Sequence, residues 1–332
     1  MVRSLVPGIY APTQTFFLSA PSASSSQQPG PLDAATIAKH AVRLVRAGCT
    51  GLVCNGSNGE AALLENEERA AVVKITREAL DSAGFTSVPI IAGTSANSVA
   101  GTLALTRDAA TAGADAVLIL SPTFVGGGGS TMGPAGIERF FELVADESPL
   151  PVVLYNYPAA AAGFDLDSDA LLRLAKHPSI VGTKFTCGSV GKMARVINDL
   201  PATVSEVNAT KEGTYFAFSG VADFILPAVI VGGTGAIVGA ANVFPRACVN
   251  VYNLAVKGDL VKARAAQQAL AKADWSLTKR AIPGFKAILD HFHGYGGAPR
   301  PPIVAISSEG AMELCGEIAD YMKYEQSLPD VK

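Results

Sequence analysis

The 332-residue chain lacks the features that would assign it to a membrane or to a nucleic acid. Its apolar runs are short and broken by glycine, proline or charged residues, so none approaches the ~20 residues that a membrane-spanning helix needs. Its basic residues form no stripe, and its net charge of −3 argues against a nucleic-acid-binding surface. We therefore expect a soluble protein with neither partner.

Cysteine is scarce, and its spacing suggests no pairing. The five cysteines are odd in number and form no CxxC pair, which in a chain of this length is typical of reduced thiols in the cytosol. The N-terminal residues enter a strand-like run within about ten residues, leaving no room for a signal or transit peptide. We therefore expect a cytoplasmic location.

Motifs for metals and nucleotide cofactors are also missing. The glycines at 126–129 lack the Gly-Lys-Ser/Thr of a phosphate-binding loop, and those at 233–239 miss the dinucleotide-binding spacing. His291 and His293 have no third ligand nearby in sequence, so we expect them at the surface of a helix end. The aspartates at 165, 167 and 169 lack the glycine and distal glutamate of a calcium loop and are expected to start a helix. The sequence thus predicts no cofactor and no metal.

What the sequence does contain is an alternation of short, branched apolar runs with longer alanine-rich segments. Eight runs are typical of strands, at residues 8–17, 51–57, 88–95, 116–124, 151–158, 180–186, within 203–220 and at 235–243. Helical patterns lie at 34–47, 65–83, 98–112, 137–145, 168–176, 246–256, 260–279, 284–291 and 309–324. Strands that are apolar on both faces, each followed by a helix, indicate a parallel sheet covered by helices.

Eight such units predict an α/β fold of the (β/α)8 type, a TIM barrel, with the surplus forming a C-terminal helical extension. A doubly wound sheet is the alternative. We expect the barrel over residues 1–245, and the last barrel helix with the C-terminal helical region over 246–332, in one structural unit. Gly48 and Gly113 are expected to end helices. The low-complexity stretch 19–31 is expected to form a loop.

Polar residues gather where the predicted strands end, and that end of a barrel carries the chemistry. Strand two ends in GSNGE (56–60), strand five in YNYP (155–158), and strand six in Lys184. Alternation along strand six puts Gly182, Lys184 and Thr186 on one face. If that face is the barrel interior, Gly182 leaves space beneath the amine. Partial desolvation would then lower the pKa of Lys184 and favour attack on a carbonyl. A lysine reaching back to water from a strand end is the alternative.

Two further strand ends supply polar groups with similar alternatives. Backbone N–H groups, a hydroxyl and an amide at Ser57 and Asn58 suit a substrate carboxylate, although an ordinary Asn-Gly turn explains them equally well. Tyr155 follows Val153 on one strand face, so its phenol would reach the same cavity as Lys184 unless it is simply a core tyrosine. Their joint placement favours a site.

These motifs together resemble the N-acetylneuraminate lyase and dihydrodipicolinate synthase family of class I aldolases, over residues 7–322. The family patterns G-(S/T)-(T/N)-G-E, Y-N-x-P and G-x-K match the ends of strands two, five and six. FSG at 218–220 and Ile237 with AN at 241–242 match later barrel positions. IPGFK at 282–286 and GYGG at 294–297 resemble the C-terminal segment of 4-hydroxy-2-oxoglutarate aldolases.

The resemblance implies a role for each site residue. Lys184 would form a Schiff base with the ketone of pyruvate or another 2-keto acid, and Tyr155 would move protons. Ser57 and Asn58 would bind the carboxylate, and the remaining substrate-binding positions are Thr186, Gly220 and Ile237. The family needs no metal or cofactor, and its members are commonly homo-oligomers, tetramers or dimers.

Two departures from the family narrow the expected substrate. Dihydrodipicolinate synthases carry an arginine after the strand-five proline, where this chain has AAAAG at 159–163. They also carry a relay tyrosine after strand four, where this chain has Phe124. We therefore expect cleavage of 4-hydroxy-2-oxoglutarate or of a 2-keto-3-deoxy sugar acid, with the neutral-tailed L-threo-3-deoxyhexulosonate as first choice. A condensing synthase and a non-catalytic barrel that binds keto acids are the alternatives.

Overall fold

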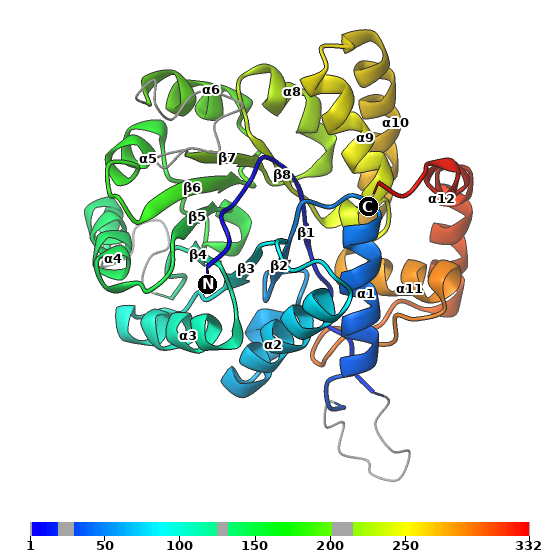
Figure 1. Cartoon of the computed structure of the whole chain (residues 1–332), viewed down its shortest axis with the longest axis horizontal. Coiled ribbons are helices and arrows are strands. Elements are labelled where there is room, and N and C mark those ends of the chain that lie inside the picture. Colours follow the sequence, from blue (N-terminus) through cyan, green and yellow to red (C-terminus); the bar gives the residue numbers. More distant parts are fainter. Residues whose placement is uncertain (1, 19–29, 125–131, 201–214, 332) are drawn as a thin grey trace.

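Eight parallel strands close into a barrel in sequence order, and β1 pairs with β8 (Figure 1). The computed structural model describes residues 2–18, 30–124, 132–200 and 215–331. The strands are β1 (Gly8–Pro12), β2 (Gly51–Cys54), β3 (Ile90–Gly93), β4 (Ala116–Leu120), β5 (Val152–Asn156), β6 (Ile180–Phe185), β7 (Phe216–Ser219) and β8 (Gly235–Ile237). The predicted TIM barrel is confirmed, and the doubly wound sheet is excluded.

Helices surround the barrel as the alternating pattern predicts (Figure 1). They are α1 (Ala34–Arg46), α2 (Asn66–Ser82), α3 (Val99–Ala112), α4 (Gly133–Glu147), α5 (Ser168–Leu174), α6 (Val190–Asp199), α8 (Ile225–Ile230), α9 (Pro245–Val256), α10 (Leu260–Thr278), α11 (Ala281–His293) and α12 (Ser308–Ser327). The sequence patterns missed α6 and α8. The six residues of α8 are too few to show helical periodicity and include Pro227.

Local signals fix several helix ends. Asp33 caps α1 by accepting a hydrogen bond from the Thr36 amide at 3.0 Å, and Asp167 caps α5 in the same way through Ala170 at 2.8 Å. Gly113 ends α3 with a left-handed φ of 99°, as predicted. Residues 19–29 of the loop predicted over 19–31, the glycines at 126–129 and the first part of the run at 203–220 lie outside the described residues.

The strands separate two apolar clusters. Inside the barrel lie inward-facing residues from most strands, among them Tyr10, Val53, Leu118, Val153 and Phe218. A larger cluster fills the layer between the strands and the helices. Because the interior is packed with side chains, polar chemistry is confined to the rim at the strand ends.

The C-terminal helices gather on one side of the barrel, beside α1 and α9 (Figure 1). Glu325 of α12 is 1% exposed and accepts hydrogen bonds from the amides of Arg246 and Ala247, at 3.0 and 2.8 Å. These amides open α9, so α12 supplies the cap that the first turn of α9 lacks in its own sequence. No helix in the described ranges is long and apolar enough to cross a membrane.

Candidate active site

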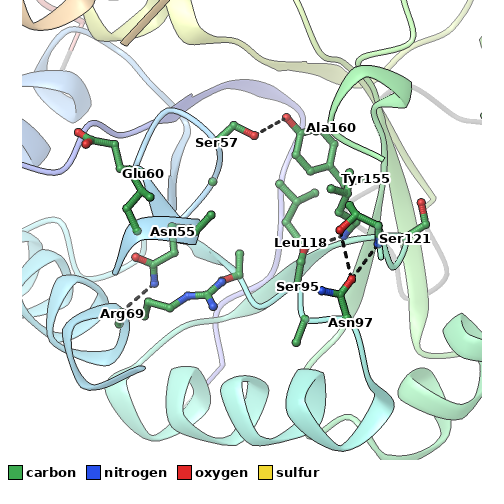
Figure 2. Close-up of a pocket in the computed structure, with 18 of the residues that line it drawn as sticks. Asn55, Ser57, Glu60, Arg69, Ser95, Asn97, Leu118, Ser121, Tyr155 and Ala160 are labelled. Atoms are coloured by element: carbon green, nitrogen blue, oxygen red, sulfur yellow. Dashed lines mark hydrogen bonds between the residues drawn. The ribbon is translucent and has the colours of Figure 1, made fainter. Parts of the chain in front are cut away.

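The structure brings Lys184, Tyr155 and Ser57 together at one end of the barrel. Lys184 on β6 pairs in register with Tyr155 on β5, and its amine nitrogen lies 4.2 Å from the centre of the tyrosine ring. The phenol oxygen lies 3.5 Å from Oγ of Ser57, in the loop after β2 (Figure 2). Three separate strand ends therefore contribute an amine, a phenol and a hydroxyl to one place.

The amine of Lys184 is buried, with 4% of the residue exposed. Within the described parts of the chain no carboxylate forms an ion pair with it, whereas most other buried cations, such as Lys286 and Arg300, have one. The face of the Tyr155 ring is its principal contact. A lysine reaching back to water would be exposed at its tip, so the snorkelling alternative does not describe this side chain.

The prediction that Gly182 leaves space beneath the amine is wrong. A Cβ atom at this position would lie 2.4 Å from the backbone oxygen of Phe216 and 2.9 Å from its Cβ. The neighbouring strand β7 therefore occupies the volume that the missing side chain provides. Glycine is required here because β6 and β7 approach closely, which sequence alternation alone does not reveal.

Asn58 lies beside Ser57 but makes different contacts. Its Oδ1 accepts a hydrogen bond from Nε2 of Gln14 at 3.4 Å. A Cβ atom placed on Gly239 would lie 3.2 Å from the side-chain nitrogen Nδ2 of Asn58. Asn58 thus packs between the segments that follow β1 and β8, and Ser57 turns toward Tyr155.

The other three predicted substrate-binding residues lie on the β6–β8 side of the barrel. Thr186 follows β6, and its hydroxyl is buried with no hydrogen-bond partner in the described structure. Gly220 follows β7 and packs on that hydroxyl so closely that a Cβ would lie 2.0 Å from Oγ1. Ile237 ends β8 and is fully buried inside the barrel. An unpartnered buried hydroxyl near the lysine is available to a bound ligand.

A cavity of about 480 Å³ opens above Tyr155, beside the ends of β2 to β5 (Figure 2). Ser57 and Tyr155 line it, whereas Lys184 and the other predicted site residues do not. Tyr155 is therefore the residue that the lysine and the cavity share. The remaining polar lining consists of Asn55, Glu60, Arg69, Ser95, Asn97, Ser121 and Thr123, and apolar parts come from Leu118, Leu120, Ala160, Ile282 and Ile303.

Arg69 is a lining residue that the sequence patterns missed. It belongs to the first turns of α2, and its side chain extends toward the cavity (Figure 2). Its Nη2 donates to the backbone oxygen of Gly93 at 3.3 Å, its Nε is buried without a partner, and no carboxylate in the described ranges pairs with it. Burial lowers the pKa of its guanidinium. This cavity therefore contains a cation, although residues 159–163 carry no charge.

The motifs that were set aside occupy structural positions. Asp167 caps α5 as predicted, and Asp165 accepts a hydrogen bond from Nδ2 of Asn156 at 2.8 Å. His291 is exposed, but His293 is partly buried, and burial with nearby cations such as Arg43 lowers its pKa to about 4. The prediction of two surface histidines is therefore wrong for His293. No group of three metal-ligating side chains occurs in the described part of the chain.

The fold and this site define a class of barrel enzyme, with a buried lysine and a tyrosine phenol at the carboxyl ends of the strands. Comparison with known proteins makes the assignment specific. The chain belongs to the Dihydrodipicolinate synthetase family, whose sequence model matches residues 16–320.

Two curated relatives and one solved structure show where in the family the chain lies. An L-threo-3-deoxy-hexylosonate aldolase of Aspergillus niger is 45% identical, over 98% of each chain. A probable mitochondrial 4-hydroxy-2-oxoglutarate aldolase of Emericella nidulans is 42% identical, also over 98% of each. The structure of YagE from E. coli K12, in complex with pyruvate, aligns with a TM-score of 0.81 and 27% identity. The alignment covers 96% of this chain and 99% of the YagE chain.

Proposed function

We propose that this chain cleaves a 2-keto-3-deoxy sugar acid to pyruvate and an aldehyde through a Schiff base on Lys184. The chain is an aldolase, a carbon–carbon lyase, and L-threo-3-deoxyhexulosonate, which gives pyruvate and glyceraldehyde, is our first choice of substrate. The observation that carries the proposal is the buried Lys184 amine against the Tyr155 ring, whose phenol faces Ser57. The relatives named as aldolases and the pyruvate complex of YagE support it.

The proposed mechanism begins with attack of the Lys184 amine on the C2 ketone of the substrate. Loss of water from the adduct gives a protonated imine, and Tyr155 carries the protons for this step. The imine withdraws electrons, so removal of the proton from the C4 hydroxyl breaks the C3–C4 bond and releases the aldehyde. The remaining enamine takes a proton at C3. Water then hydrolyses the imine, which frees pyruvate and restores the lysine.

In this mechanism the other residues bind the keto-acid end. We assign the substrate carboxylate to the backbone amides and side chains of Ser57 and Asn58, where hydrogen bonds to a charged acceptor are strong. The unpartnered hydroxyl of Thr186 is available to an oxygen of the substrate, and the close approach of Gly220 and the packing of Ile237 shape that side.

Borohydride trapping tests the proposal directly. Reduction in the presence of pyruvate should attach one stable three-carbon adduct to Lys184, detected by peptide mass spectrometry on the folded protein. Lys184→Ala should abolish both the adduct and pyruvate release from every 2-keto-3-deoxy acid tried. Absence of an adduct on folded wild-type protein would refute the Schiff-base mechanism.

A second substrate, 4-hydroxy-2-oxoglutarate, is favoured by one observation. Arg69 brings into the cavity a guanidinium that forms no ion pair within the described residues, and such a group suits a distal carboxylate. If the carboxylate binds there, Arg69→Met should lower kcat/KM for 4-hydroxy-2-oxoglutarate at least about tenfold, and that for the neutral sugar acid much less. An equal loss for both substrates would leave the sugar acid as the better assignment. Including aspartate semialdehyde with pyruvate in the same panel tests the condensing synthase.

We also propose a cytoplasmic location. None of the five cysteines, all within the described residues, forms a disulfide, which suits a reducing compartment. The name of the Emericella nidulans relative places that protein in mitochondria. A fluorescent fusion imaged with a mitochondrial marker decides between the two compartments.

A further inference from the structure

The loop after β2, which holds Ser57 and Asn58, has a left-handed residue at each end. Asn55 and Glu60 take φ values of 56° and 58°. Asparagine tolerates this conformation, whereas for glutamate it is strained and persists only where the surroundings over-determine it. At the first end, Nδ2 of Asn55 donates to the backbone oxygen of Arg69 at 2.8 Å. The second end depends on the side chain of Glu60.

Glu60 is held by the C-terminal part of the chain. Its Oε1 lies 2.6 Å from Nζ of Lys286 on α11, and its Oε2 accepts a hydrogen bond from the amide of Arg300 at 2.6 Å. The side chains of Lys286 and Glu60 are 1% and 0% exposed. Lys286 also donates to the backbone oxygen of Ala298 at 3.1 Å. Both oxygens of one buried carboxylate are therefore used by a single distant segment.

A second ion pair lies beside the first and connects the same C-terminal segment, residues 286–300, to α2. The guanidinium of Arg300 pairs with Glu68, and its Nη1 donates to the backbone oxygen of Leu63 at 3.3 Å, just after the loop. Both cations contact the ring of Phe17, whose centre lies 4.5 Å from Nζ of Lys286 and 4.2 Å from the guanidinium carbon of Arg300. The C-terminal segment thus contacts the chain at the end of the loop, just after it, and in the following helix α2.

We propose that Lys286 and Glu60 are positioning residues for the reaction: their buried ion pair fixes the 56–60 loop, and so sets Ser57 against Tyr155. This inference rests on the proposed function, because it assigns the keto-acid carboxylate to that loop. A purely structural pair would stabilise the fold without controlling substrate affinity. A positioning pair controls affinity even when stability is restored by other means.

Single and double substitutions separate these two roles. Glu60→Gln and Lys286→Met keep side-chain volume but each leaves a buried charge unpaired, so both should lower the melting temperature. The double variant leaves no unpaired charge and should recover most of it. In all three, KM for the cleaved keto acid should rise by about tenfold or more, since small displacements of binding groups have large effects. The double variant should keep this rise, and its kcat should change less than its KM.

Matched controls isolate the loop. Glu317→Gln removes an ion pair between α12 and Arg280, the residue before α11. Its two atoms lie 2.6 Å apart, and neither residue contacts the loop. Its KM should equal that of the wild type. Lys286→Arg keeps the charge and should retain most of the affinity. If Lys286→Met does not fold, Glu60→Gln alone gives the same comparison of KM with kcat.

The outcomes are distinguishable from failure of the proposed function. Wild-type protein that forms no borohydride-trapped adduct with pyruvate would overturn the Schiff-base proposal, whatever the variants do. If the wild type forms the adduct and the double variant recovers both its melting temperature and its wild-type KM, the pair is structural and the positioning role is wrong. A raised KM in the folded double variant, with the KM of the Glu317→Gln control unchanged, supports the positioning role.

Discussion

The side chain of Tyr155 joins two parts of the site that otherwise do not touch. Its ring covers the amine of Lys184 and stacks on Tyr157, with the centres of the two tyrosine rings 5.6 Å apart, while its hydroxyl faces Ser57 and the cavity. The ring contacts hold the side chain in place, and in the proposed mechanism only the hydroxyl carries protons. Removing the oxygen alone therefore separates the structural contribution from the proposed catalytic one.

Tyr155→Phe should lower kcat by about 10²-fold or more, because proton transfer by a positioned group contributes that much. The melting temperature should change little, since the ring contacts remain. Stopped-flow or steady-state pyruvate release measures the loss, and borohydride trapping should show slower adduct formation on Lys184. Tyr252→Phe, which removes a hydroxyl bonded to the backbone oxygen of Thr234, serves as the control. Unchanged kcat in Tyr155→Phe would assign the proton transfers to another group.

Asp274 gives a prediction about pH. This α10 residue is 4% exposed, and burial, with a smaller effect from Asp223, raises the pKa of its carboxyl to about 7. An unfolded chain releases this proton near pH 4, so the folded state holds more protons between pH 4 and 7. Stability from this group is complete below pH 4 and declines as the pH rises through 7. Urea denaturation at pH 5 and 7.5 should show a larger loss in the wild type than in Asp274→Asn. Equal losses would contradict the assignment.

At the scale of elements, α12 stabilises α9 from outside. Glu325 satisfies two amides of the first turn of α9, and Arg246 of that turn pairs with both Glu325 and Asp330. Burial raises the pKa of the Glu325 carboxyl, against hydrogen bonds from those amides. Through this contact the last helix, α12, stabilises a helix that packs on the barrel.

Glu325→Leu should destabilise the fold by about 3 kcal/mol, because it leaves two amides in the first turn of α9 without their acceptor and leaves Arg246 with Asp330 alone. Glu325→Gln keeps an acceptor oxygen and should cost about 1 kcal/mol. Denaturant unfolding of both variants measures the difference, and kcat at temperatures well below unfolding should stay near that of the wild type. A leucine variant as stable as the glutamine variant would show that the cap contributes little.

Most of the elements could be predicted from sequence, but α6, α8, the ends of the elements and the distant contacts could not. Seven strands follow from their apolar runs, because burial on both faces leaves a strong local pattern, whereas β7 was placed only within a weaker run at 203–220. The predicted first strand ran to residue 17, whereas β1 ends at Pro12, since the following residues are also buried but bend over the rim. The amide of Arg300 meets Glu60 across 240 residues of sequence, a contact that no local pattern encodes.

In the candidate site, too, the residues with a local sequence pattern were predictable and those placed by distant contacts were not. Lys184 and Tyr155 lie near the carboxyl ends of β6 and β5, and Ser57 follows β2, so the barrel rule brings the three together once the fold is known. Arg69 lies within the helix α2 and lines the cavity, a placement that the helical pattern of its segment does not indicate. The role of Gly182 depends on the spacing of β6 and β7, which is set by Phe216 on the neighbouring strand.

At the scale of the whole molecule, we propose that residues 1–245 and 246–332 form one structural unit. The support comes from contacts that cross the boundary in both directions, Lys286 with Glu60 and Glu325 with the start of α9. We also propose a homo-oligomer, tetramer or dimer, on the family resemblance.

Phe124 gives this proposal a test. It follows β4 and is 88% exposed. On the family resemblance it stands where the synthases carry a tyrosine that enters a neighbouring subunit. Light scattering after size-exclusion chromatography should give a mass at least twice that of one chain. Phe124→Glu should shift the distribution toward smaller species, because a charge would be buried at the interface. A monomeric wild-type protein would refute the oligomer.

The long-range grip of the C-terminal segment on the 56–60 loop also sets an order of events during synthesis. The ribosome makes the loop, Tyr155 and Lys184 well before residues 286–300, and chains begin to fold from the N-terminal end as they emerge. A nascent chain can therefore enclose its lysine before the partners of Glu60 exist. If the ion pair fixes the loop as proposed, the loop reaches its final conformation only near release, and a prematurely terminated chain would hold the proposed nucleophile beside a loop that is not yet fixed.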